Sequence, residues 1–308
     1  MFQRFLVPLD GSRQAEKAIP VAADLARVVH GTITLARIIE PPTGESTFET
    51  GETPGTQITL FAEARNYLET LLDRYEQELA GLHLILEITP GKVPSSLFAM
   101  ASQQHLDLIV MCSREESALK RWVLGSMAQE IFRHSPLPVL ALHEHDHHRA
   151  LFQGTHPLRI LVPYDRADLT DAALTPLFQL LGNVSPSAAH EIHLLHVVSL
   201  PPAISGLSGE AYIPQAFWDE EREKAEQELH AFVQRLAQTK PTTVRCVFKT
   251  KIIMNADIAG TLLSQAQPGL PEAEGGAYDL IAMATHGRTG LKHLLLGSVT
   301  ERVFGTTT

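Results

Sequence analysis

The sequence predicts an α/β protein built from two doubly wound parallel-sheet modules in tandem. Short β-branched runs alternate with longer amphipathic stretches, which is typical of parallel strands joined by helical crossovers. The chain also repeats itself: Phe5–Asp10 recurs as Ile160–Asp165, and Asp107–Met111 recurs as Asp279–Met283. A Gly-Ser pair stands fourteen residues after each methionine. Because these anchors keep their order, the repeat predicts two copies of one fold.

In the first copy we expect five strands and four helices. The strands are expected near 4–9, 32–39, 82–88, 107–112 and 138–142, and the helices near 13–29, 57–80, 94–104 and 124–134. Strands and helices alternate along this copy, so one parallel sheet flanked by helices is predicted.

In the second copy we expect four strands and four helices. The strands are expected near 158–163, 191–198, 243–249 and 278–284, and the helices near 169–182, 214–238, 255–266 and 298–304. The first copy continues into a fifth strand after its last helix, whereas the second copy stops at Phe304–Thr308. A missing strand leaves a sheet edge short, so we expect either a truncated chain or an edge covered by a partner.

These boundaries divide the chain into three parts. We place the first module at 1–146, a linker at 147–156 and the second module at 157–308. We expect the two modules to pair within the chain, and a homodimer stays open.

Composition restricts the class of protein. The chain has 308 residues, enough for two cores, and a formal net charge of −10, which argues against nucleic acid or an anionic membrane as a partner. Its two cysteines, Cys112 and Cys246, lie in apolar runs and cannot form a disulfide framework. We see neither a signal peptide nor an apolar run of about 18 residues. A soluble cytoplasmic protein is therefore expected.

The loop from Ala284 to Ser298 is the most informative segment. It follows the apolar run Tyr278–Met283 and precedes a segment with helical character that opens at Ser298. A glycine-containing loop between the carboxyl end of a strand and the amino end of a helix favours bound anions. The loop matches neither the P-loop nor the G-x-G-x-x-G dinucleotide pattern. A different nucleotide-binding design is indicated.

Three motifs carry a family resemblance: Val-Pro-x-Asp, Asp-Leu-Ile-x-Met and Thr-His-Gly-Arg-Thr-Gly…Leu-Leu-Gly-Ser-Val. They resemble the universal stress protein family, whose modules have an adenine nucleotide α-hydrolase-like fold. The resemblance covers nearly the whole chain and is most specific in the second module. In ATP-binding members the loop reads G-x-x-G, nine residues, then G-[S/T]. These positions correspond here to Ala284, Gly287, Gly297 and Ser298, and alanine for the first glycine is a mild departure.

The resemblance implies an ATP site in the second module, and Mg²⁺ or Mn²⁺ could accompany the phosphates. The residues assigned to this site are Pro163, Tyr164, Asp165, Val197, Ala284, His286, Gly287, Arg288, Gly297, Ser298, Val299 and Thr300. Asp165 could accept hydrogen bonds from ribose or adenine, or it could cap the following helix. Val197 could pack on adenine or be an ordinary core residue. Ser298 is a good helix N-cap, and Val299 and Thr300 would offer N–H groups to a phosphate.

The first module departs from this pattern. It keeps Asp10, Gly125 and Ser126, but Glu115 replaces the second glycine of the loop and Glu116 lies beside it. Negative charge at the place where polyphosphate should approach would weaken ATP binding. We expect a degenerate, mainly structural module, with an altered ligand preference as the alternative.

His286 and Arg288 allow a catalytic interpretation, since one could transfer a proton and the other could offset phosphate charge. No general base or dedicated metal carboxylate accompanies them, so we assign no catalytic residue. The predicted function is an ATP-binding regulatory protein of stress adaptation. A slow ATPase or autokinase, and an interaction module that binds no nucleotide, stay open as alternatives.

Histidines outside this loop give weaker signals. The run His143–His148 could hold zinc or nickel, but a linker does not fix a tetrahedral geometry, so no metal site is assigned. His193 and His196 are three residues apart in an expected strand and should point to opposite faces of the sheet. We interpret both as structural.

Overall fold

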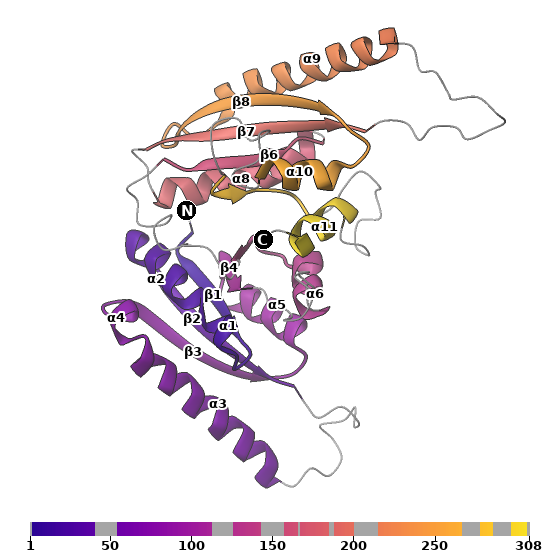
Figure 1. The fold of residues 1–308 in the computed structure, drawn as a ribbon. Helices are drawn as coiled ribbons and strands as arrows, with labels where there is room; N and C mark the ends of the chain where they lie inside the picture. Colours follow the sequence, from indigo (N-terminus) through magenta and orange to yellow (C-terminus); the bar gives the residue numbers. More distant parts are fainter. Residues whose placement is uncertain are drawn as a thin grey trace, which may run out of the picture. The chain divides into compact units, whose positions relative to one another are not determined.

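The fold was analysed in a computed structural model of the chain (Figure 1). The structure describes residues 2–40, 54–112, 126–142, 157–165, 167–184, 188–199, 215–266, 278–285 and 297–306. It divides into two compact units, Met1–Gly154 and Thr155–Thr308, and each is described by itself. The linker expected at 147–156 lies outside the described residues.

The first unit contains a five-stranded parallel sheet with the order β3-β2-β1-β4-β5. Its strands are β1 (Arg4–Leu9), β2 (Thr32–Ile39), β3 (His83–Pro90), β4 (Leu108–Cys112) and β5 (Val139–Leu142). Its helices are α1 (Arg13–Glu16), α2 (Ala18–Val29), α3 (Pro54–Arg74), α4 (Glu76–Leu79), α5 (Val93–Gln103) and α6 (Ser126–His134). The five strands confirm the predicted doubly wound module.

The single helix expected over 13–29 is instead two helices that meet at Lys17. Pro20 lies in the first turn of α2 and has no N–H to donate to the carbonyl of Glu16. The break therefore falls where the proline removes a helical hydrogen bond.

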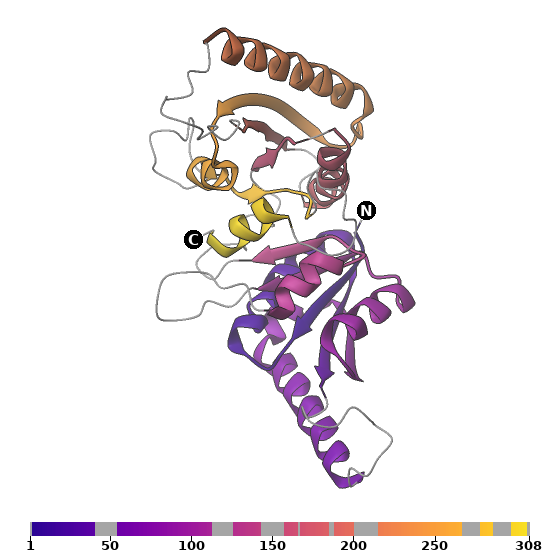
Figure 2. The same cartoon turned by 90° about the vertical axis from the view of Figure 1, so that its right-hand side faces the viewer.

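The second unit contains a four-stranded parallel sheet with the order β8-β7-β6-β9. Its strands are β6 (Arg159–Pro163), β7 (Ala189–Val198), β8 (Arg245–Met254) and β9 (Leu280–Ile281), and its helices are α8 (Ala167–Val184), α9 (Gln215–Thr239), α10 (Ile258–Ala266) and α11 (Ser298–Thr306). Figure 2 shows α10 and α11 on one face of this sheet and α8 and α9 on the other. Two such sheets confirm the predicted tandem fold.

Strand β9 is much shorter than the strand expected over 278–284. Strand β9 pairs with β6 at Ile160 and Leu161 only, and its counterpart β4 pairs with β1 at Phe5 and Leu6 only. Strand β4 is longer because it also pairs with β5 over four residues. The described part of the second unit has no counterpart of β5, so β9 keeps only the pairing with β6.

An aspartate just before each of these strands reinforces the short pairing. Asp107 Oδ2 accepts hydrogen bonds from the N–H groups of Gln3 (2.8 Å) and Arg4 (2.9 Å). Asp279 Oδ2 accepts one from the N–H of Arg159 (2.7 Å). Each carboxylate therefore joins two strands that lie far apart in the sequence.

The core on the α10 and α11 side of the second sheet combines strand and helix residues. Its buried members are Leu161, Leu195, Val197, Ala259, Leu262, Leu263 and Val303. This cluster holds both helices against the carboxyl half of the sheet. None of the helices within the described ranges is long and apolar enough to span a membrane.

We predict that His190 in β7 is needed for its acceptor nitrogen. His190 is fully buried, and its Nδ1 accepts a hydrogen bond from the N–H of the buried Leu158 (3.1 Å). His190→Ala would leave that N–H unsatisfied and open a cavity, so the free energy of unfolding should fall by about 2–4 kcal/mol. Denaturant titration measures the change.

His190→Asn is the matched variant, since its amide oxygen can replace Nδ1 as acceptor. It should lose about half as much as the alanine variant or less. Equal losses in the two variants would show that ring packing matters and the hydrogen bond does not.

Candidate functional site

The candidate site lies at the carboxyl ends of β6 and β9. Strand β6 is the first strand of its sheet, with β7 on one side and β9 on the other. The chain leaves β6 toward α8 on one face of the sheet and leaves β9 toward α11 on the other face. Ligands of doubly wound sheets bind in the crevice at such a point. The ends of these strands bring Pro163, Tyr164 and Asp165 to the same edge as Ala284.

Two hydrogen bonds join the ends of the loop that follows β9. The N–H of Gly297 donates to the carbonyl oxygen of Thr285 (3.0 Å), and Thr300 Oγ1 donates to the carbonyl oxygen of Ala284 (3.2 Å). Thr300 is 3% exposed, so its hydroxyl bond is protected from water. The first turn of α11 is thus fastened to the chain as it leaves β9.

The N-cap of helix α11 is Gly297, one residue before Ser298, which the sequence suggested as the cap. The N–H of Glu301 donates to the carbonyl oxygen of Gly297 (2.9 Å), so Gly297 occupies the N-cap position and Ser298 is the first helical residue. The N–H groups of Ser298, Val299 and Thr300 precede the first intrahelical bond. Such groups, together with the helix dipole, suit an anion.

Asp165 is exposed at the end of β6. Its counterpart Asp10 accepts a hydrogen bond from the N–H of Ser12 (2.9 Å), and Ser12 in turn caps α1. In the first module this aspartate therefore orders the start of a helix. For Asp165 the ligand role and the capping role both stay predictions.

Two predicted site residues have side chains committed to packing. Tyr164 is 8% exposed, and its ring lies 5.0 Å from that of Phe232 in α9 and 5.1 Å from that of His196. Its ring therefore faces α9 and not the loop ends. Val197 belongs to the core cluster on the other face, where Val299 packs against it. The structure thus brings Val197 close to the start of α11.

Several predicted residues lie outside the described ranges. They are His286, Gly287 and Arg288 in the second-module loop, Glu115 and Glu116 in the first, and the run His143–His148. Within the described ranges, no group of three histidine, cysteine or acidic residues could hold a metal ion.

Thr300 has a role that sequence reasoning missed. It was assigned for its backbone N–H, whereas the structure also uses its hydroxyl to close the loop. At the matching position of α6 the first module has Ala128, which has no hydroxyl. Alignment of the two Gly-Ser segments within this one chain would have shown the difference.

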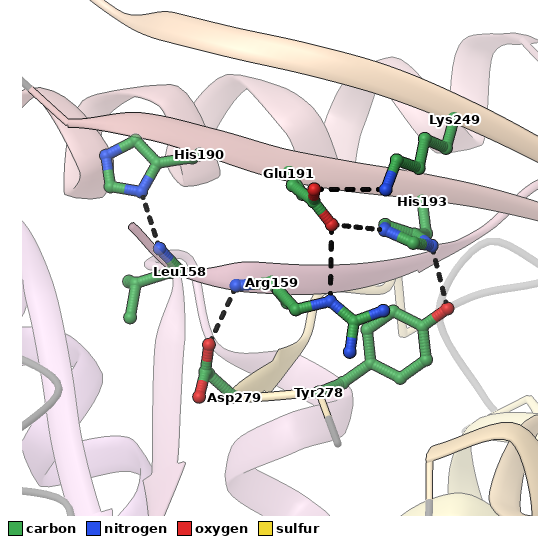
Figure 3. Close-up of polar contacts among 8 residues, drawn as sticks. All are labelled: Leu158, Arg159, His190, Glu191, His193, Lys249, Tyr278 and Asp279. Atoms are coloured by element: carbon green, nitrogen blue, oxygen red, sulfur yellow. Dashed lines mark hydrogen bonds and ion pairs between the residues drawn. The ribbon is translucent and has the colours of Figure 1, made fainter. Parts of the chain in front are cut away.

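A second polar cluster lies at the amino end of the same sheet (Figure 3). Glu191 of β7 accepts hydrogen bonds from His193 Nε2 (3.1 Å), Lys249 Nζ (3.0 Å) and Arg159 Nε (3.2 Å). His193 Nδ1 lies 2.9 Å from the hydroxyl of Tyr278. Since a carboxylate can only accept, Nε2 carries the proton and Nδ1 of the neutral ring accepts from the tyrosine.

Hydrogen bonds and burial shift the pKa values of two residues in this cluster. The hydrogen bonds from His193 and Lys249 lower the pKa of Glu191 to about 2. Burial lowers the pKa of His193 below its ordinary value, although Glu191 acts in the opposite sense. His193 is therefore neutral at neutral pH and connects Tyr278 to the sheet. His196 contacts Tyr164 on the opposite face of the sheet, as the strand periodicity predicted.

Hydrogen bonds connect a hydroxyl, an imidazole and a carboxylate in this cluster, in the order Tyr278, His193, Glu191. The cluster lies at the amino ends of the strands, whereas the candidate site lies at their carboxyl ends. Tyr278 and Asp279 lead directly into β9, and the Arg159 guanidinium lies 5.1 Å from the centre of the Tyr278 ring. The contacts thus hold the residues just before β9 against β6 and β7. They stabilise the strand that ends at the loop.

Sequence comparison with known proteins finds the same family that the motifs resemble. A sequence model of the universal stress protein family matches residues 1–143 and 267–308. The stress response protein NhaX of Bacillus subtilis is 27% identical over 158 residues, which cover 44% of this chain and 95% of that protein.

Two solved structures share the fold. One is a protein of unknown function from Pseudomonas aeruginosa, with a TM-score of 0.58 at 16% identity over 99% of this chain and 89% of that one. The other is a universal stress protein from Archaeoglobus fulgidus, with a TM-score of 0.51 at 18% identity over 85% of this chain and 80% of that one.

We predict a pH-dependent contribution of Glu191 to stability. A carboxylate whose folded pKa is lowered stabilises the fold above its unfolded pKa, near 4.5, and loses that contribution as pH falls toward about 2. Glu191→Gln should therefore lower the free energy of unfolding at pH 6 by about 1 kcal/mol. Denaturant titrations of both proteins from pH 6 to pH 2.5 should show the difference shrinking. A difference that stays constant over this range would contradict the prediction.

Proposed function

Since this chain belongs to the universal stress protein family, we propose that it is an ATP-binding regulatory protein of the stress response whose second module holds the nucleotide. The observation that carries the proposal is the pair of hydrogen bonds that joins the start of α11 to the residues after β9. The bonds from Gly297 to Thr285 and from Thr300 to Ala284 fasten the first turn of α11 to the chain that leaves β9. A site prepared in this way avoids part of the ordering cost of binding.

The phosphates would be bound at the amino end of α11. The N–H groups of Ser298, Val299 and Thr300 are donors there, and the helix dipole favours negative charge. Gly287 and Gly297 would let the backbone approach the phosphates closely, and Arg288 would lie near them. Mg²⁺ or Mn²⁺ would accompany the bound triphosphate.

The adenosine would be bound along the ends of β6 and β7. Asp165, exposed at the end of β6, would accept hydrogen bonds from ribose hydroxyls or an adenine nitrogen. Val197 would offer an apolar surface to the base, and Pro163 and Tyr164 would shape the strand end. Because the Tyr164 ring packs on Phe232, its part in binding would be limited to its backbone.

The first module would not share this activity. Its loop carries Glu115 and Glu116, and its α6 has Ala128 where α11 has Thr300. The negative charges would repel polyphosphate, and the alanine could not make the bond that closes the loop. One nucleotide per chain follows.

The regulatory role rests on the family and on the stress response that the B. subtilis relative is named for. We place the protein in the cytoplasm, where ATP is available, as part of this proposal. Pairing of the two modules, within one chain or between two chains, would be the response that nucleotide controls.

We predict that ATP binds the full chain with a stoichiometry near one. Isothermal titration calorimetry measures it, and Gly287→Glu should abolish most of the binding because it copies the loop of the first module. Glu115→Gly is the matched control in the first module and should leave the affinity of the second-module site unchanged. Two equivalent sites, no binding, or normal binding by Gly287→Glu would contradict the assignment.

We also predict that ATP turnover is far below the rate of about 10 s⁻¹ that is typical of enzymes. No residue of the site is assigned as a general base, so the attacking water would lack a proton acceptor. Phosphate release under saturating ATP measures the rate. Sustained hydrolysis near the typical rate, lost in His286→Ala while ATP affinity is retained, would favour the ATPase alternative instead.

A further inference from the structure

A bidentate ion pair joins α11 to the start of α10. Arg302 Nη1 and Nη2 donate to Asp257 Oδ1 (2.5 Å) and Oδ2 (2.8 Å). Arg302 lies in the second turn of α11, and Asp257 immediately precedes Ile258, the first residue of α10. Side chains of a helix lean toward its amino end, so the arginine reaches back toward the first turn of α11.

Asp257 is itself fixed by its surroundings. Its Oδ1 accepts a hydrogen bond from the N–H of Gly260 (3.0 Å), and its own N–H donates to Asn255 Oδ1 (2.9 Å). The N–H of Asn255 donates in turn to the carbonyl oxygen of Val198 at the end of β7 (3.1 Å). Asp257 is thus the N-cap of α10 and is anchored to the sheet.

Gly260 supports this geometry by having no side chain. A Cβ at this position would collide with the carboxylate of Asp257. A glycine within a helix lowers helix stability by about 1 kcal/mol relative to alanine. Gly260 therefore makes room for the Asp257 carboxylate but weakens α10. The Gly260 N–H and the Arg302 guanidinium lower the pKa of Asp257, which is therefore ionised at neutral pH.

The first module has a different arrangement at the matching places. Glu130 of α6 corresponds to Arg302 when the two Gly-Ser segments are aligned. The N-cap of α5 is Lys92, which makes no side-chain capping bond. Of the two modules, the pair therefore occurs in the one whose loop keeps Gly287.

We propose that Asp257 and Arg302 form a positioning pair that sets the orientation of α11's first turn toward a bound phosphate. The inference rests on the proposed function and extends it to residues that do not touch the ligand. The Gly297 and Thr300 bonds fasten the front of α11 to the loop, and the Asp257–Arg302 pair fastens its second turn to α10. With the first and second turns of α11 both held, the N–H groups of the first turn keep one direction.

The proposal separates positioning from simple charge. Asp257 is a negative charge next to α11 and to the carboxyl end of β7, so a purely electrostatic role predicts that its removal strengthens ATP binding by reducing repulsion. If the carboxylate instead holds Arg302 and α11 in place, its removal should weaken ATP binding. Asp257→Asn therefore gives opposite results for the two explanations, and asparagine retains an oxygen that can cap α10.

The experiment compares ATP and adenosine binding to the full chain by calorimetry. Asp257→Asn and Arg302→Gln should each weaken ATP binding by up to about fivefold, since an exposed ion pair contributes only modestly. Adenosine has no phosphates, so its affinity should not change. The double variant should be no weaker than the single variants, because the two residues act as a pair. Arg65→Gln breaks an exposed pair with Glu69 (2.9 Å) in α3 and should change neither affinity.

Three results would overturn the proposal: unchanged or tighter ATP binding by Asp257→Asn, equal weakening of ATP and adenosine, or additive losses in the double variant. Hydrogen exchange of the Glu301 amide in the ligand-free protein gives an independent readout. Both variants should exchange this amide faster, since it forms the first bond of α11. If the wild-type chain binds no ATP, the proposed function fails, and unchanged exchange in both variants would separately overturn the positioning role.

Discussion

Each sheet depends on a carboxylate that joins its first strand to a strand about a hundred residues later. The ladder between these strands is only two residues long in either module, too short to define the register securely. Asp107 and Asp279 add hydrogen bonds to the backbone of β1 and β6 at the point where the ladder begins. In the second module this contact supports the register of β9 against β6, and β9 is the strand that leads to the candidate site.

The sequence predicted the two parallel-sheet modules and most of their elements because both modules repeat the same short motifs. Asp107 and Asp279 were identified as parts of the repeated motifs. Their hydrogen bonds could not be predicted, because they are made to neighbouring strands that lie far away in the sequence. The end of β8 was missed because Thr250 and Lys251 interrupt the apolar run, although the ladder with β7 continues to Met254. Edge strands accept polar residues, so hydrophobic pattern underestimates their length.

The sequence predicted where the backbone of the candidate site lies, but it did not predict most of the side-chain contacts. Gly297 and Ser298 are found by motif, and the structure places them at the start of α11 as expected. The hydroxyl of Thr300, the direction of the Tyr164 ring and the partner of Arg302 follow from tertiary packing. Asp257 and Arg302 are 45 residues apart, and neither belongs to a motif that the sequence singled out.

The polar cluster around Glu191 has a consequence for how a chain with two similar sheets avoids pairing the wrong strands. Exchange of equivalent strands is a characteristic error of tandem repeats. If β7 entered the first sheet in place of β2, its neighbour would carry Ile85 where Lys249 now stands, and Leu106 would replace Tyr278. Glu191 would lose the lysine and His193 would lose its phenol, leaving polar groups short of partners in a packed sheet. The cluster therefore favours the pairing of β7 with the strands of its own module over pairing with those of the first.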